Sequence, residues 1–481
     1  MNKTKKQIKL WEALLPALVL ISILAFNVYV FGDSATSGSN QFVLIIGAAV
    51  AMAIGLKNKF KVSEMLENVY DNIKSTSGAI LILLFVGSLS GTWLISGIIP
   101  TMIYYGLKIL QPSIFFPATL IITAIVSVAT GSSWTTSATV GIALIAIGQS
   151  LGFDSGMVAG AVISGAYFGD KMSPMSDTTN LAPAMAGTDL FTHIRYMTIT
   201  TVPTFLITLI IFIFIGLFST STGEVDTEKT LKSITDIFNV SPFLFLVPAL
   251  VIFMIIKKTN PLIALFTGAV LGGVFALIFQ PSIVAKVGGG TQMDFVTGYK
   301  GVLNALTIQT SIETDNSQLT DLFRAKGMAG MLSTIWLIIC AMIFGGVMEA
   351  IGALSKITEV LLSFATSVFG LFASTVASCL ALNLTASDQY LAIVVPGKMF
   401  AEAYKQKNLA PENLSRTLED TGTVTSVLVP WNTCGAYQSQ VLGVDTLAYL
   451  PYAFFNIISP FMTLLFAALN IKIKKIVEDI A

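Results

Sequence analysis

The sequence predicts an all-α polytopic membrane protein with roughly 11–13 transmembrane or re-entrant segments, arranged as an inverted-topology repeat with broken helices and hairpins. Hydrophobic residues make up 54% of the 481-residue chain and charged residues only 11%, whereas a soluble domain carries about 25% charged residues. Apolar runs of about 20 residues, the length that crosses a bilayer, recur along the chain. Two distant tracts also share the same alternation of apolar runs and polar clusters. Lys plus Arg and Asp plus Glu number 27 each, so no basic excess indicates a nucleic-acid partner.

Residues 1–74 are expected to form an amino-terminal two-helix segment. Its spans run from Trp11 to about Phe31 and from Phe42 to Leu56. Lysines precede the first span and follow the second, at positions 3, 5, 6 and 9 and at positions 57, 59, 61 and 74. Because lysines gather on the cytoplasmic side of a membrane, the amino terminus is expected in the cytoplasm.

Residues 75–187 are expected to form the first transport repeat. The apolar tract 78–110 is interrupted by Gly and Pro, and a span over 113–129 follows. Polar clusters then occupy 130–137 and 169–180, at what should be membrane depth. Polar groups there are costly unless they line a path or a site.

Residues 188–325 are expected to hold central helices and a long polar loop. Spans are predicted from Leu190 to about Phe218, over 242–256 and from Pro261 to Phe279. The remaining stretch, 280–327, is polar and is interpreted as an extracytoplasmic loop.

Residues 326–444 are expected to form the second, inverted repeat. It begins with a span over 329–350, and two further segments lead to a polar cluster at 383–388. Residues 398–416 are interpreted as a cytoplasmic loop, and a second polar stretch covers 419–435.

Residues 445–481 are expected to form a carboxy-terminal helix, over about 447–469, and a cytoplasmic tail with lysines at 472, 474 and 475. The loop charges place the first repeat's start inside and the second repeat's start outside. Two halves of opposite orientation can exchange conformations, so that one site near the bilayer midplane opens to each face in turn.

The tracts Gly131–Gly141, Gly169–Gly187 and Asp420–Gly435 resemble the NhaC family of sodium/proton antiporters, within the ion-transporter superfamily. The resemblance extends over essentially the whole chain. It implies exchange of Na⁺ for H⁺ across the bacterial cytoplasmic membrane, a scaffold part, a moving part with hairpins and broken helices, and frequently a homodimer. Some members resemble exchangers of small organic anions, such as malate for lactate with coupled cations.

Cation/proton exchange needs a carboxylate that holds either a proton or a cation. Burial raises the pKa of a carboxyl group and can bring it near neutral pH. Asp170 and Asp420 are the first candidates, since they are expected at corresponding places in the two halves, and Asp177 and Asp388 come next. The alternative is that Asp170 and Asp177 are loop or cap residues at a membrane edge.

Na⁺ prefers oxygen ligands, as Ca²⁺ and Mg²⁺ do. The polar clusters offer hydroxyls and amides, although many could instead bond back to their own helix. The candidates are Thr130, Ser132, Ser133, Thr135, Ser173, Ser176, Thr178 and Asn180 in the first half, and Asn383, Thr385, Ser387, Thr423, Asn432 and Thr433 in the second. The cation is expected to bind transiently, without a structural metal.

Other polar and aromatic residues could have a functional or a structural role. Lys171 directly follows Asp170, and a Lys–Asp pair that Na⁺ disrupts would be a switch. Trp134 and Trp431 either shape the cavity or only pack. His193, the single histidine, is either a pH sensor or an ordinary residue at the membrane interface.

The sequence is compatible with two classes of function. The first is a Na⁺/H⁺ antiporter. The alternative is a cation-coupled exchanger or symporter of a small organic anion or amino acid, which would be bound at helix amino termini or at Lys171. No GxxxxGK[ST] or GxGxxG motif occurs in a strand–helix setting and no nucleophile–base pair is evident, so neither a cofactor nor an enzymatic activity is expected. The protein is expected to be surrounded by the lipid bilayer.

Overall fold

The computed structural model describes residues 8–31, 38–218, 227–314, 320 and 323–476. The described chain is almost entirely helical, and eight helical segments are long and apolar enough to cross a membrane. They are α1 (Leu10–Phe31), α2 (Ser39–Lys57), α4 (Ser77–Ile95), α6 (Pro112–Thr130), α11 (Leu190–Phe218), α14 (Pro261–Phe279), α18 (Leu332–Ala350, preceded by the 3₁₀ turn η4, Ala329–Met331) and α20 (Val368–Thr385). These helices confirm the spans expected from the apolar runs.

Two further spans are bent. The helix α12 (Thr227–Ile237) meets η3 (Pro242–Phe245) and α13 (Leu246–Ile256) at 87°. The short α24 (Thr446–Tyr449) and η7 (Leu450–Tyr452) meet α25 (Phe454–Ala468) at 54°. The span expected over 447–469 is therefore two helical pieces.

Two series of helices follow the same order in the two halves. The first consists of α4, α5 (Ile98–Ile109), α6, the continuous run α7–η2–α8 (Ser133–Thr136, Ser137–Gly141, Ile142–Ser150), α9 (Ser155–Met172) and α10 (Asp177–Ala186). The second consists of α18, α19 (Ala353–Ser363), α20, α21 (Gln389–Gln406), the run α22–η5–η6 (Pro411–Leu418, Glu419–Thr423, Ser426–Leu428) and α23 (Thr433–Leu442). Equivalent boundaries differ by 254 to 256 residues up to the ends of α6 and α20, and by 256 residues beyond them.

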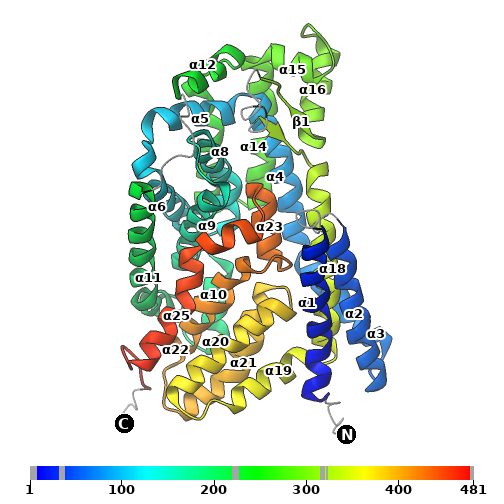
Figure 1. The fold of residues 1–481 in the computed structure, drawn as a ribbon, viewed down its shortest axis with the longest axis vertical. Coiled ribbons are helices and arrows are strands. Elements are labelled where there is room, and N and C mark those ends of the chain that lie inside the picture. The colour runs from blue at the N-terminus through cyan, green and yellow to red at the C-terminus, as the bar shows by residue number, and fades with distance from the viewer. Residues whose placement is uncertain (1–7, 32–37, 219–226, 315–319, 321–322, 477–481) are drawn as a thin grey trace.

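The two series run in opposite directions. In Figure 1, the path from α9 to α10 leads downward, whereas the path from α22 to α23 leads upward. Likewise α8 lies near the upper end and α21 near the lower end. The nearly constant spacing and the opposite directions confirm an inverted repeat with hairpins and broken helices.

The bend between the first two helices of each half depends on a glycine in the left-handed conformation. Gly97 joins α4 to α5 with φ +79°, and Gly352 joins α18 to α19 with φ +75°. L-residues with a Cβ are disfavoured at such angles. The interruption of the apolar tract 78–110 thus has a backbone cause, and it recurs in the second half.

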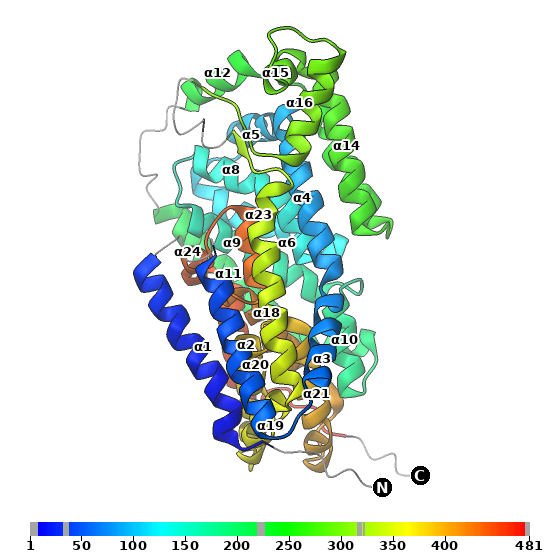
Figure 2. The same cartoon turned by 90° about the vertical axis from the view of Figure 1, so that its right-hand side faces the viewer.

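Helices that precede each series in the chain pack against the other series. The helix α14 packs on α4, whereas α2 and α3 (Val62–Ser75) pack on α18. Figure 2 shows this arrangement, with α2 and α3 beside the lower part of α18 and α14 beside the upper part of α4. The large apolar side chains of α11 that remain exposed, including Leu206, Ile210 and Phe214, suit a surface that faces lipid.

The interpretation of two stretches as loops is wrong in part. Residues 280–327 contain α15 (Pro281–Val287), α16 (Phe295–Thr307) and two short paired strands, β1 (Thr310–Ser311) and β2 (Arg324–Ala325). Residues 398–416 belong mostly to α21 and α22. The lysines and other polar residues of these stretches lie on amphipathic helices. One polar face lowers the mean hydropathy of a segment without ending the helix, so the segments resembled loops in the sequence.

Candidate functional site

Asp170 lies in the last turn of α9 and faces the start of the re-entrant segment α7–η2–α8. Its Oδ2 accepts hydrogen bonds from the backbone N–H of Ser133, at 3.1 Å, and from the Ser133 hydroxyl, at 2.6 Å. The first N–H groups of a helix have no partner within the helix and attract anions. Asp170 is therefore bound to a broken helix at its positive end.

At the break between α9 and α10, the last carbonyl oxygens of α9 meet a side-chain hydroxyl. The Thr179 hydroxyl donates to the carbonyl of Lys171, at 3.1 Å, and lies 3.3 Å from that of Asp170. Ser176 caps α10 by accepting from the Thr179 N–H. The break thus places carbonyls and hydroxyls, which are oxygen donors suited to a hard cation, beside Asp170.

The second half builds its break with the same kind of groups. Asp388 caps α21, and its Oδ1 accepts from the N–H groups of Tyr390, at 2.8 Å, and Leu391, at 3.1 Å. Asn432 caps α23, and its amide also donates to the carbonyl of Asn383, at 3.1 Å. The two polar clusters of this half are thereby held together.

Lys171 forms an ion pair with Asp420, and both side chains are completely buried. Asp420 belongs to η5, a π-helix, a form that often marks functional positions. Its other carboxylate oxygen accepts from the hydroxyl of Thr200 on α11, at 2.7 Å, and from that of Thr463 on α25. The Asp420 carboxylate thus has a cation and two hydroxyl donors as partners.

Lys171 therefore pairs across the two halves and not with its neighbour Asp170. The expected correspondence of Asp170 and Asp420 also differs from the structure. At the spacing of 256 residues, Asp170 is equivalent to Ser426, and Asp420 is equivalent to Ser164. The two acids come from different points of the repeat and approach the same region from opposite sides.

A cavity of about 610 Å³ lies beside these breaks. It is bounded by the turn between α6 and α7, the break after α9, the start of α21, and the connections before α4 and α14. The predicted site residues that line it are Thr130, Ser132, Thr135, Asp170, Ser176, Asp177, Thr178, Asp388 and Thr433. The cavity therefore combines both halves, with the Asp170 and Asp388 carboxyl groups in its wall.

The other predicted residues lie outside the cavity lining. Ser133 and Lys171 hold Asp170 and Asp420 as described, Trp431 donates to the Leu384 carbonyl, and Thr385 bonds back to its own helix. Asn180 has an exposed side chain, as does the cavity-lining Asp177. Those that are buried behind the wall are Ser173, Asn383, Ser387, Asp420, Thr423 and Asn432.

The aromatic candidate Trp134 joins the halves. Its ring stacks on Tyr437 of α23 with 3.9 Å between centroids, and the Tyr437 hydroxyl donates to the Trp134 carbonyl at 3.1 Å. Trp134 also lines the cavity. Trp134 thus both packs against the other half and lines the cavity.

Several buried polar residues near Asp420 were not singled out from the sequence. Thr200 and Thr463 bind Asp420, and Arg416 and Glu419 are fully buried on the same helical run. A clue was present in the sequence, since Glu419 is a second acid directly beside Asp420. The two threonines gave no signal, because their helices are separated from Asp420 along the chain.

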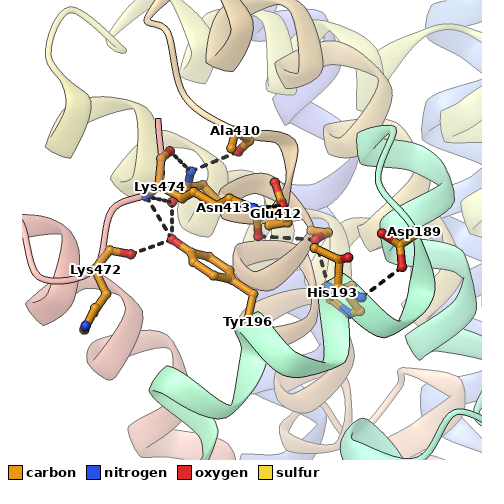
Figure 3. A network of polar contacts seen from close by, with 10 residues as sticks. Asp189, His193, Tyr196, Ala410, Glu412, Asn413, Lys472 and Lys474 are labelled. Atoms are coloured by element: carbon orange, nitrogen blue, oxygen red, sulfur yellow. Dashed lines mark hydrogen bonds and ion pairs between the residues drawn. The ribbon is translucent and has the colours of Figure 1, made fainter. Parts of the chain in front are cut away.

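A polar network ties the carboxy-terminal segment to α11 and α22 (Figure 3). The Tyr196 hydroxyl lies 2.6 Å from Asn413 Oδ1 and 2.6 Å from the carbonyl of Lys472, and it accepts from the N–H of Lys474 at 3.2 Å. His193 is completely buried, with Nδ1 2.8 Å from the Ser415 hydroxyl. It therefore lies inside the protein. The Asp189 carbonyl accepts from the backbone N–H of His193 at 3.0 Å. Hydrogen bonds from the side chain and the backbone N–H of Thr192 lower the pKa of the Asp189 carboxyl group.

Comparison with known proteins adds family information. The family model described as the Na⁺/H⁺ antiporter family matches residues 165–471. The chain is 38% identical over 432 residues to the Na⁺/H⁺ antiporter NhaC of Alkalihalophilus pseudofirmus, which covers 90% of each chain. It is 35% identical over 421 residues to the malate-2H⁺/Na⁺-lactate antiporter of Bacillus subtilis, covering 87% of each. It is 33% identical over 462 residues to the arginine/ornithine antiporter ArcD of Halobacterium salinarum, covering 94% of this chain and 90% of that protein.

Proposed function

The chain belongs to the Na⁺/H⁺ antiporter family, and we propose that it is a secondary transporter that exchanges Na⁺ for H⁺ by alternating access. The observation that carries this proposal is the position of Asp170, at the wall of a cavity between inverted halves and beside backbone carbonyls and side-chain hydroxyls. The acidic site would hold Na⁺ or H⁺ in turn. Because either ion compensates the buried negative charge, binding of one favours release of the other.

The proposed location is a bacterial cytoplasmic membrane, with both termini in the cytoplasm. Two observations support this orientation. The lysines at 57, 59, 61 and 74 and at 472, 474 and 475 flank membrane-crossing helices at the chain's two ends. The start of α1 and the end of α25 also lie toward the same end of the molecule (Figure 1).

The test is ion flux in proteoliposomes that contain the protein, a pH dye and no organic solute. A Na⁺ gradient is expected to drive proton movement in the opposite direction, and collapse of the membrane potential with an ionophore then reports whether exchange moves net charge. A potential of 100 mV contributes about 2.3 kcal/mol per net charge moved. Silence of the dye under a Na⁺ gradient would overturn the proposal.

A second candidate is cation-coupled exchange of a small organic anion or amino acid. The size of the cavity favours it, since about 610 Å³ far exceeds the roughly 30 Å³ that one water molecule occupies in the liquid. The malate/lactate and arginine/ornithine relatives also make organic substrates a reasonable class. Proton movement that begins only when an organic acid or amino acid is added would favour this candidate.

A further inference from the structure

Glu419 is a buried acid for which the site described above has no use. Its side chain is completely buried, and neither carboxylate oxygen has a hydrogen-bond partner of normal geometry in the described chain. An ionised carboxylate in that position costs several kcal/mol, whereas a protonated one costs far less. The conformation described here therefore accommodates the neutral acid.

Glu419 lies one layer behind the cavity wall. The groups that act on it electrostatically include Lys171 and Asp170, and the hydroxyls of Thr178 and Thr423 are its nearest polar neighbours. Thr178 belongs to α10, which packs against η5 and lines the cavity. Movement of this wall would bring water or a cation to the Glu419 carboxyl group.

Other titratable groups surround Glu419 on the elements packed against η5. Cys379 of α20, Tyr404 of α21 and Arg416 of α22 lie on elements that pack against η5. Lys171 and Asp170 of α9 also act on Glu419 electrostatically, His193 lies on α11, and Asp420 is next to Glu419 in the chain. Tyr404 is held by Thr375, and His193 by Ser415. Asp420 is committed to Lys171.

Among the four charged groups counted around Glu419, positive and negative charges are equal in number when Glu419 is neutral. Lys171 and Arg416 supply two positive charges, the latter with its guanidinium 4.7 Å from the Tyr196 ring centroid. Asp170 and Asp420 supply two negative charges. An ionised Glu419 adds a third negative charge, which one further cation would compensate.

We propose that Glu419 is the carboxyl group that carries the exchanged proton, while Asp170 binds the cation. This rests on the proposed function and divides its two ions between two acids. When Na⁺ binds beside Asp170, its charge stabilises the Glu419 carboxylate. The O–H bond of Glu419 then breaks, the proton passes to water in the cavity, and the electron pair stays on the carboxylate. When Na⁺ leaves at the other face, the carboxylate takes a proton from water there.

The test compares Glu419→Gln with wild type in two assays. The amide imitates a carboxyl group that cannot lose its proton. Na⁺-driven proton movement is expected to fall at least about tenfold, while exchange of ²²Na⁺ for Na⁺ stays within about threefold of wild type. Glu402→Gln, the same change at an exposed position of α21, is expected to leave both unchanged.

Each other outcome overturns the proposal. Normal proton movement by Glu419→Gln means that the proton is carried elsewhere, and loss of both activities by a folded variant places Glu419 in the cation site. If Glu419→Gln does not fold, Glu419→Asp decides, because the shorter acid must shift the pH profile of exchange and an unchanged profile rules Glu419 out. If wild type itself moves no protons in response to Na⁺, the proposed function fails and not this assignment alone.

Discussion

Lys171 and Asp420, 249 residues apart in the sequence, form a fully buried ion pair between α9 of the first half and η5 of the second. The pair joins the broken helix that carries Asp170 to the π-helix that carries Glu419. Because both partners lie away from water, each depends on the other for charge compensation. The contact between the two halves is thus electrostatic as well as steric.

Removal of one partner of this pair is expected to be worse than removal of both. Asp420→Asn leaves the Lys171 ammonium buried without a counter-charge, a change that typically costs about 3–5 kcal/mol. The double variant Lys171→Met with Asp420→Asn leaves no charge unpaired and should recover most of the loss. Thermal unfolding in detergent measures this order, and a single variant as stable as wild type would contradict it.

Asp170→Asn is expected to abolish coupled exchange while the protein still folds. The amide keeps the size of the side chain and can still contact Ser133, but it carries no charge with which to bind a cation. Na⁺-driven proton movement in proteoliposomes is the measurement. Asp236→Asn on the exposed face of α12 is the matched control, and normal exchange by Asp170→Asn would move the cation site elsewhere.

Tyr196→Phe is expected to loosen the carboxy-terminal segment. The change removes the hydroxyl that contacts Asn413 and the backbone of Lys472 and Lys474, and partners left unsatisfied cost about 1–3 kcal/mol. Trypsin should then cleave after the lysines at 472–475 more quickly. Tyr299→Phe, at a side chain that is 62% exposed, should leave the cleavage rate unchanged, and equal rates in all three proteins would refute the anchoring role.

The two hinge glycines are expected to differ in their tolerance of alanine. A Cβ at Gly352 meets nothing within 4 Å, so Gly352→Ala adds only the strain of a positive φ, about 1–2 kcal/mol. A Cβ at Gly97 would lie 2.4 Å from Gln280 Nε2 as well, so Gly97→Ala should destabilise more. Melting temperatures of the two variants, with Gly78→Ala in a helix as a neutral control, test this order.

The spans could be predicted because apolar composition alone determines which segments cross a bilayer. The inverted repeat was also within reach, since Gly, Pro and hydroxyl residues mark the interrupted helices in both halves. The ends of α9 and α22–η6, near Met172 and Leu428, coincide with the polar stretches noted in the sequence. Local composition thus predicted where the helices break.

The pairing of charges could not be predicted in the same way. Sequence spacing suggested Asp170 as a partner for Lys171, yet adjacent residues of a helix point to different faces, and the fold brings Asp420 there instead. Thr200 and Thr463 join Asp420 only through the packing of α11 and α25 around η5. Such contacts depend on tertiary structure, which no local pattern encodes.

The most direct test of an acidic site that holds Na⁺ or H⁺ in turn is proton release on Na⁺ binding. Na⁺ is added to the purified protein in detergent and weak buffer, while a pH dye records protons set free. The wild-type protein is expected to release protons in step with Na⁺ bound, and less Na⁺ should bind as the pH falls. Na⁺ binding without proton release, or equal release by Asp170→Asn, would contradict the account.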